Sequence, residues 1–361
     1  MEDESFSGTP ELVAHLVLAF PEKNPGLLGD SAAFPEPHMF LPSSEFELWF
    51  GQLEEEVSST LGRKLAHAVT EAEEHRLRTM RAELPNPIFG KRKKQLNFLN
   101  SHLNLRSHGM MEQMRGDGQL EFLVRDRCFG PIAAGIASAS AEFLNRRRFR
   151  MRWSDDGGTQ TKVTLEPDQR DIPPATKVDA RWNDAFSNPI GGEHPLSLAV
   201  KEGDGRWSID GVKILSISRD TIVRLEESIL PFASTIEDVP TQFEWVGVKD
   251  DDRKVVWSAM AEASRKRFEA NEDLVLVAED DHWIHVGHRF LGRAGLGAVT
   301  KANSNGQHGA VEITLPTVFH PAIVAGTMAG AWERVEGRPA KCEWVNSAKG
   351  HTLSLAPLHE L

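Results

Sequence analysis

The stretch PIAAGIASASAEFLNRRRFRMRWSDDGGTQTKVTLEP, residues 131–167, decides the fold because the chain contains it twice. The second version, PAIVAGTMAGAWERVEGRPAKCEWVNSAKGHTLSLAP, occupies residues 321–357. Each version predicts a helix of small residues, a strand that ends in tryptophan, a polar turn and a second strand. Three pairs match at one constant offset: Gly135 with Gly326, Glu142 with Glu333, and Trp153 with Trp344.

Matches upstream extend the similarity over most of the chain, at offsets that differ because the loops differ in length. We therefore predict an α+β protein, a tandem duplication of a helical layer followed by a strand–helix–strand–strand unit, folded as a pseudo-two-fold pair. The first repeat domain is expected at residues 1–168 and the second at 169–361. The upstream matches are Arg63-Lys64 with Arg253-Lys254, His102 with His288, Leu105 with Leu291, and Gly109 with Gly295.

Composition restricts the class of protein. The 361 residues are 40% hydrophobic and 26% charged, which is typical of a globular chain with room for two domains. The net charge of −12 disfavours nucleic acid and membranes as partners, because phosphates and lipid headgroups are anionic too. The N-terminus is acidic, and no apolar run approaches the roughly 20 residues of a membrane span. We expect a soluble, cytoplasmic protein.

Metal and cofactor signatures are missing from the sequence. The two cysteines, Cys128 and Cys342, are too few for a disulfide framework or a four-thiolate zinc site. The glycine cluster at residues 292–297 fits a helix end rather than a phosphate loop or a dinucleotide fingerprint. We therefore predict no metal and no cofactor.

Local signals predict several element ends. Ser44 followed by Glu47 is a capping-box pattern at a helix start. Acidic residues 250–252 precede a predicted helix and basic residues 265–267 close it, an order that complements the helix dipole. Residues 116–118 (GDG) and 168–174 (DQRDIPP) predict a turn before a strand and the linker between the halves, respectively.

This order of elements resembles the 4-vinyl-reductase-type domain, a small-ligand-binding family related in fold to certain TRAPP-complex subunits. The matching features are a glycine that ends the last helix (Gly109 or Gly295), a strand, the small-residue helix and a terminal hairpin. The resemblance implies a ligand-binding domain in each half. Family members often carry metal-holding cysteines around that hairpin, whereas here it reads SDDGGTQT or NSAKGHT, so no metal role is carried over.

Four of six candidate ligand-binding residues come from the repeated stretch. Trp153 and Trp344 end matching strands, where an indole either forms the floor of an apolar pocket or caps the core. Glu142 and Glu333 lie near helix C-termini, where a carboxylate opposes the helix dipole and needs a partner. Each glutamate either forms a salt bridge to another element or acts as a general acid or base between the repeats.

Histidines supply the other two candidates, His102 and His288, which correspond between the halves. His282, His285 and His288 are spaced by three residues, so they spread around a helix and at most two could share a metal. We interpret them as polar surface.

Two basic clusters stand out in this acidic chain, KRKK at residues 91–94 and RRRFR at residues 146–150. We interpret both as solvated faces, with contact to an acidic partner or nucleic acid as the alternative. The small residues of the paired helices predict close packing, either of helix on sheet within a half or of helix on helix between halves.

The leading functional prediction is a non-catalytic binding or assembly protein. It would hold a small hydrophobic ligand between each helical layer and its sheet, or contact a protein partner. One alternative is an enzyme that uses Glu142 and Glu333, or the histidines, in a groove between the repeats. The other is an adaptor that binds nucleic acid or an acidic partner through the basic clusters of the first repeat.

Overall fold

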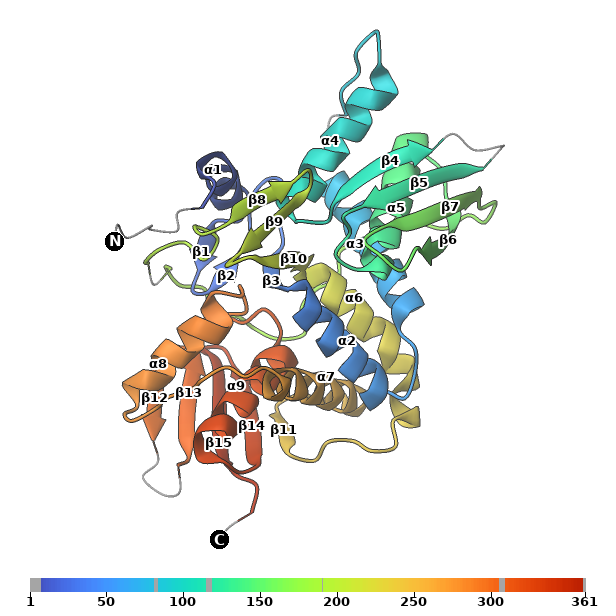
Figure 1. Cartoon of the computed structure of the whole chain (residues 1–361). Coiled ribbons are helices and arrows are strands. Elements are labelled where there is room, and N and C mark those ends of the chain that lie inside the picture. Colours follow the sequence, from blue (N-terminus) through green and yellow to red (C-terminus); the bar gives the residue numbers. More distant parts are fainter. Residues whose placement is uncertain (1–7, 81–83, 115–118, 190, 305–308, 360–361) are drawn as a thin grey trace.

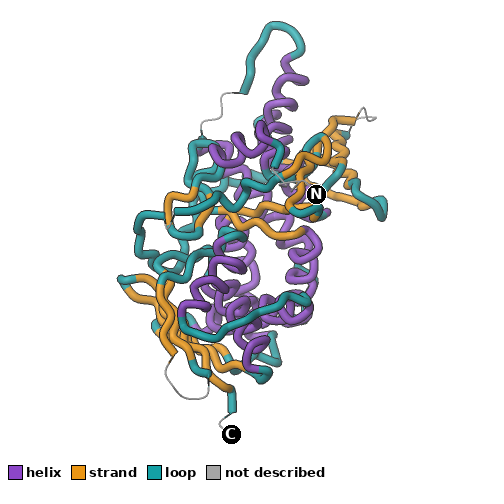
Figure 2. The backbone as a smooth tube through the Cα atoms, turned by 60° about the vertical axis from the view of Figure 1, so that its left-hand side comes forward, coloured by secondary structure: helices purple, strands orange, loops and turns teal. Residues whose placement is uncertain are grey.

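The computed structural model describes residues 8–80, 84–114, 119–189, 191–304 and 309–359. Within these ranges the chain forms nine α-helices and three β-sheets, so the predicted α+β class is confirmed (Figure 1). None of the described helices is both long enough and apolar enough to cross a membrane. The helices gather in the middle of the molecule and the sheets lie around them (Figure 2).

A six-stranded sheet brings together strands from both halves of the sequence, in the order β1-β2-β3-β10-β9-β8. Its centre is the antiparallel pair β3 (His38–Pro42) and β10 (Val212–Ser218), in which Phe40 lies opposite Ser216. Two consecutive short strands flank each member of this pair. These flanking strands are β1 (Glu22–Asn24), β2 (Leu27–Leu28), β8 (Val200–Gly203) and β9 (Arg206–Ile209).

Helices that follow the central strands pack across the two halves. α2 (Ser43–Glu56) follows β3 and packs on α7 (Asp251–Ala270), while α6 (Arg219–Ile229) follows β10 and packs on α3 (Gly62–Thr79). At the first contact, Trp49 Nε1 donates to Ser264 Oγ at 3.0 Å. The predicted division at residue 168 stays a prediction, and it separates strands and helices that share one sheet and one core. The 3-10 turn η1 (Leu230–Thr235) extends α6.

Two further sheets lie at the outside. The four-stranded sheet has the order β4-β5-β7-β6, and the five-stranded sheet contains β12-β13-β15-β14 in the same sense, with β11 added parallel to β14. Trp153 lies opposite Val163 in one sheet, as Trp344 lies opposite Leu353 in the other. The strands are β4 (Met110–Met114), β5 (Leu120–Arg125), β6 (Phe149–Asp155), β7 (Thr161–Pro167), β11 (Phe243–Val246), β12 (Lys301–Ser304), β13 (Val311–Leu315), β14 (Ala340–Ser347) and β15 (Gly350–Pro357).

The small-residue helices contact the strands of their own half, as one of the two predicted arrangements has it, but their closest packing is on helices of that half and not between the halves. α5 (Gly130–Asn145) lies against α3, and α9 (Pro321–Glu336) lies against α7. A Cβ added to Gly135 would be 2.5 Å from the carbonyl oxygen of Ala66, and one added to Gly326 would overlap the carbonyl oxygen of Ala261. Glycine is therefore required at both crossings.

The helix ends agree with the sequence predictions only in part. The capping box is wrong, because α2 begins at Ser43 and no side chain caps it. The predicted acidic start of α7 is confirmed, since Asp251 and Asp252 lie in its first turn and the Asp250 side chain accepts a hydrogen bond from the Arg253 amide. Basic residues 265–267 contact carboxylates of other elements as well as α7 itself, so they do more than close the helix. The turn predicted at residues 116–118 lies outside the described residues.

Candidate functional site

The two candidate tryptophans belong to the core. Trp153 is half-buried and packs against the main hydrophobic cluster. Trp344 is 1% exposed and its ring lies 5.2 Å from His351 and 6.4 Å from Trp245, measured between ring centroids. The capping role is therefore what the packing supports for both residues.

The two candidate glutamates tie helix ends to the strands that follow. Glu142 accepts from the Phe149 amide at 3.1 Å and from Arg148 Nη1 at 2.5 Å. Glu333 accepts from the Ala340 amide at 2.9 Å and from Arg265 Nη1 at 2.8 Å. Since α5 and α9 lie in different parts of the molecule, the structure does not bring the two carboxylates together (Figure 1).

The candidate histidines have unlike surroundings. His288 is exposed and begins the π-helical turn η2 (His288–Gly292), which extends α8 (Asp281–Gly287). His282 and His285 have ring centroids 6.5 Å apart. Across the described ranges, no three His, Cys, Asp or Glu side chains are placed to hold a metal ion. His102, by contrast, is buried on α4 (Lys91–Leu105).

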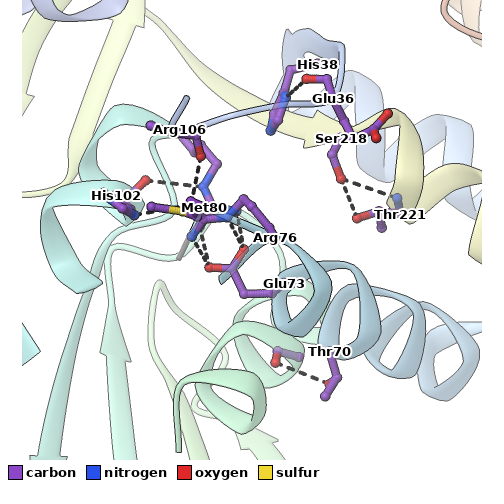
Figure 3. A network of polar contacts seen from close by, with 12 residues as sticks. Glu36, His38, Thr70, Glu73, Arg76, Met80, His102, Arg106, Ser218 and Thr221 are labelled. Carbon is purple, nitrogen blue, oxygen red and sulfur yellow. Dashed lines mark hydrogen bonds and ion pairs between the residues drawn. The ribbon is translucent and has the colours of Figure 1, made fainter. Parts of the chain in front are cut away.

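His102 belongs to a buried charge cluster that joins α3 to the end of α4 (Figure 3). The Glu73 carboxylate is 4% exposed and accepts bonds from Arg106 at 2.9 and 3.0 Å and from Arg76 Nε at 2.9 Å. Burial alone would raise the pKa of Glu73, but the two guanidinium groups hold it well below its usual range. The cluster carries one net positive charge while the nearby histidines are neutral.

Those histidines are held neutral by burial and by the arginines. Burial, with Arg106 next in effect, lowers the pKa of His38 to about 3, and burial with Arg76 lowers the pKa of His102 to about 4. The pKa of His108 is lowered too, by burial and then Arg106. The adjoining cavity measures about 30 Å³, a size that suits water and not an organic ligand.

The cluster also fixes the position of a loop that forms one wall of a larger groove. Arg76 Nη1 donates to the Ala33 carbonyl at 3.1 Å and to His102 Nδ1 at 3.2 Å. Ser31 Oγ donates to the Ala19 carbonyl at 2.6 Å, which ties the loop at residues 31–33 to α1 (Pro10–Ala19). These hydrogen bonds fix the positions of α1, α3, α4 and this loop relative to one another.

The groove lies between α1, the loop at residues 31–33, the last turns of α4 and the β8–β9 hairpin. Its volume is about 710 Å³, within the range of small-molecule sites. Trp207 is 1% exposed and its Nε1 donates to the Asn104 carbonyl at 3.1 Å, which fixes the indole at the wall. Apolar atoms make up most of the groove surface, and seven apolar side chains contribute to it beside polar ones: Leu12, Leu18, Ala19, Ala32, Ala33, Leu105 and Trp207.

Ionisable side chains are among the polar residues of the groove. Glu11, His15, Lys201 and Arg206 all contribute to it, and Arg206 is 3.8 Å from Asp126. Leu18 remains 77% exposed beside them. The arrangement suits a molecule with an apolar body and a polar or charged end, because such a ligand leaves no buried charge unpaired.

Sequence reasoning missed this groove. A signal for α1 is present, because Leu12, Leu16 and Ala19 follow helical spacing after Pro10, a favoured first residue of a helix. Residues 203–205 (GDG) indicate a turn, but the approach of that turn to α1 does not follow from spacing. No protein-family model, curated protein or solved structure was found to match the chain.

Proposed function

We propose that this protein is a non-catalytic binding protein that holds one small, mainly apolar molecule in the groove beside α1. The observation that carries the proposal is the cavity of about 710 Å³, whose surface consists mostly of apolar atoms and whose lining also includes charged residues. The buried Glu73 cluster supports it, because the groove wall is held in place before any ligand arrives.

The state of the reactive side chains favours binding over catalysis. Glu142 and Glu333 each have an arginine and a backbone amide as partners, the pattern of a structural carboxylate. Burial raises the pKa of the Cys128 thiol to about 11 and raises that of Cys342 further, which makes both poor nucleophiles.

The ligand position differs from the one expected from sequence. The helix pairs α3/α5 and α7/α9 approach closely at Gly135 and Gly326, and the pocket between α3, α5 and β6 is smaller, at about 270 Å³, and is lined by Glu71, Glu74, Glu142 and Arg148. We therefore place the ligand at one groove formed by segments from both halves, rather than between each helical layer and its sheet.

The tandem duplication is also proposed as the architectural basis of this protein. Its support is the shared order of β4-β5-β7-β6 and β12-β13-β15-β14, and the central β3/β10 pair with two short strands on either side. The equivalent positions of Trp153 and Trp344 in their hairpins, and of Gly135 and Gly326 on their helices, agree with it. The same order underlies the resemblance to the 4-vinyl-reductase-type domain.

Native mass spectrometry of the purified protein tests the binding proposal. A bound molecule from the expression host should appear as extra mass that organic solvent releases. The Ser101→Trp variant should lose this mass, because Ser101 is an exposed residue of the groove lining and an indole there would fill the space. Asn97→Trp, one turn earlier on α4 and outside the lining, is the matched control. The same extra mass on the wild type and on both variants would reject the groove as the binding site.

A further inference from the structure

The loop before α4 and the first turn of that helix stand clear of the rest of the molecule (Figures 1 and 2). At this tip Ile88 is 92% exposed and Phe89 is 84% exposed. These are the largest exposed fractions among the large apolar side chains of the described ranges. Two adjacent apolar side chains in water are unfavourable, so the tip is a candidate contact surface.

Positive charge directly follows the apolar pair. Gly90 adopts a left-handed conformation (φ +67°) at the start of α4, and KRKK at residues 91–94 forms its first turn. Lys91, Lys93 and Lys94 are exposed and have no carboxylate partner among the residues that the structure places. The positive end of the helix dipole adds to their potential, and no acidic residue lies in this turn.

We propose that this tip docks the protein on an anionic lipid bilayer. Ile88 and Phe89 would enter the interfacial layer, while the lysines reach lipid phosphates with their ammonium groups and lay their apolar stems along the surface. This docking is peripheral, since it uses a loop and one helical turn rather than a spanning helix.

The shape of the tip favours a bilayer over a protein. A stable protein interface buries about 800 Å² on each partner, which a narrow convex tip with two apolar side chains does not offer. A fluid bilayer deforms around such a tip and needs no matching concavity. Nucleic acid would satisfy the lysines but gives Ile88 no apolar partner.

The net charge of −12 is a sum over the whole chain, and the charges are unevenly distributed within the molecule. The tip is locally cationic, and the excess of carboxylates belongs to the rest of the chain. At physiological ionic strength screening acts over about 8 Å, so a tip that stands clear of the body meets the membrane with its own potential. For this segment the proposal therefore departs from the expectation of no membrane contact, which was drawn from the total charge.

Vesicle co-sedimentation of the full chain tests the charge requirement. The protein should bind phosphatidylcholine vesicles that contain phosphatidylserine, bind those of phosphatidylcholine alone weakly, and be released by high salt. Replacing the three lysines of the tip by glutamine should lower the partition coefficient on the order of 100-fold, since each lysine near an anionic surface contributes about 1 kcal/mol. The matched control replaces three exposed lysines elsewhere by glutamine and should bind like wild type: Lys249, Lys301 and Lys349.

The apolar requirement is tested in the same assay with the Ile88→Ser/Phe89→Ser double variant, which should lose most binding. Phe186→Ser, which removes a 76% exposed ring elsewhere, should not. All of these side chains are exposed, so circular dichroism should show unchanged folding.

Insertion is measured with a polarity-sensitive thiol label on the Phe89→Cys variant, since both native cysteines are buried. Its emission should shift to the blue with anionic vesicles, and that of a label on Asn97→Cys should not. Binding to an RNA homopolymer or an acidic peptide but not to vesicles, or equal shifts at both positions, would overturn the proposal.

Discussion

Glu73 and Arg106 form an ion pair with two hydrogen bonds, at 2.9 and 3.0 Å, that joins α3 to the residue after α4. Both side chains are less than a tenth exposed, and Arg76 completes the cluster from the same helix as Glu73. The same Arg76 holds the groove wall through the Ala33 carbonyl. Stability and the shape of the proposed site therefore depend on one buried carboxylate.

Removing that carboxylate should destabilise the protein strongly. In Glu73→Gln the amide preserves the shape but leaves two buried guanidinium groups without a counter-charge, and we expect a loss of about 3–5 kcal/mol in the free energy of unfolding. Urea denaturation measures it. Lys23→Gln, which breaks the exposed pair with Asp30 at 3.3 Å, should cost less than about 1 kcal/mol. A comparably small loss for Glu73→Gln would show that the cluster contributes little.

The glycines at the helix crossings should resist enlargement. Gly135→Ala and Gly326→Ala each push a methyl group into the backbone of the facing helix, and we expect each to cost about 1–3 kcal/mol or more. Gly51→Ala on α2 is the control, because no atom lies within 4 Å of the added Cβ and the helix should gain up to about 1 kcal/mol. Thermal unfolding measures the expected fall in stability at the two crossings and the expected rise for the control. A harmless change at only one crossing would argue against equivalent halves.

As the pH falls, the protein should begin to lose stability at a higher pH than carboxylate protonation alone would cause. The unfolded chain protonates histidine near pH 6.5, whereas burial and Arg76 hold the folded pKa of His102 at about 4, so the unfolded state binds more protons between these values. Stability is therefore full above about pH 6.5 and falls as the pH drops toward 4, by up to about 1.4 kcal/mol per pH unit for each such histidine.

Unfolding free energies measured from neutral to mildly acidic pH test this slope. The His102→Gln variant keeps an acceptor for the bond from Arg76, and it should reduce the slope by the contribution of one histidine. The control His285→Gln, at an exposed site, should leave the slope unchanged. An unchanged slope in His102→Gln would contradict the assignment of a neutral buried imidazole.

Much of the local structure follows from the sequence. The two repeated stretches, residues 131–167 and 321–357, each begin with proline before a run of small residues and continue into two strand-like segments, which predicts α5, α9 and the hairpins that follow them. The partner of a small-residue stripe does not follow from spacing. Only the structure shows that Gly135 meets Ala66 on α3 rather than a strand.

The groove could not be predicted for a related reason. Its walls come from four separate segments between residues 9 and 207, with Leu12 in the first and Trp207 in the last, and their approach depends on the six-stranded sheet. Basic residues 265–267 illustrate the same limit. Their order along α7 suggests helix-end electrostatics, but Lys266 and Arg267 contact Glu56 and Glu45 of α2.

Titration with anilinonaphthalenesulfonate, an apolar fluorophore with an anionic end, tests the central claim most directly. We predict one saturable site per chain in the wild type and in Asn97→Trp, with a strong rise in dye emission, and loss of that site in Ser101→Trp. Indistinguishable titrations of all three folded proteins would contradict the account, because the groove beside α1 would then not be the binding site.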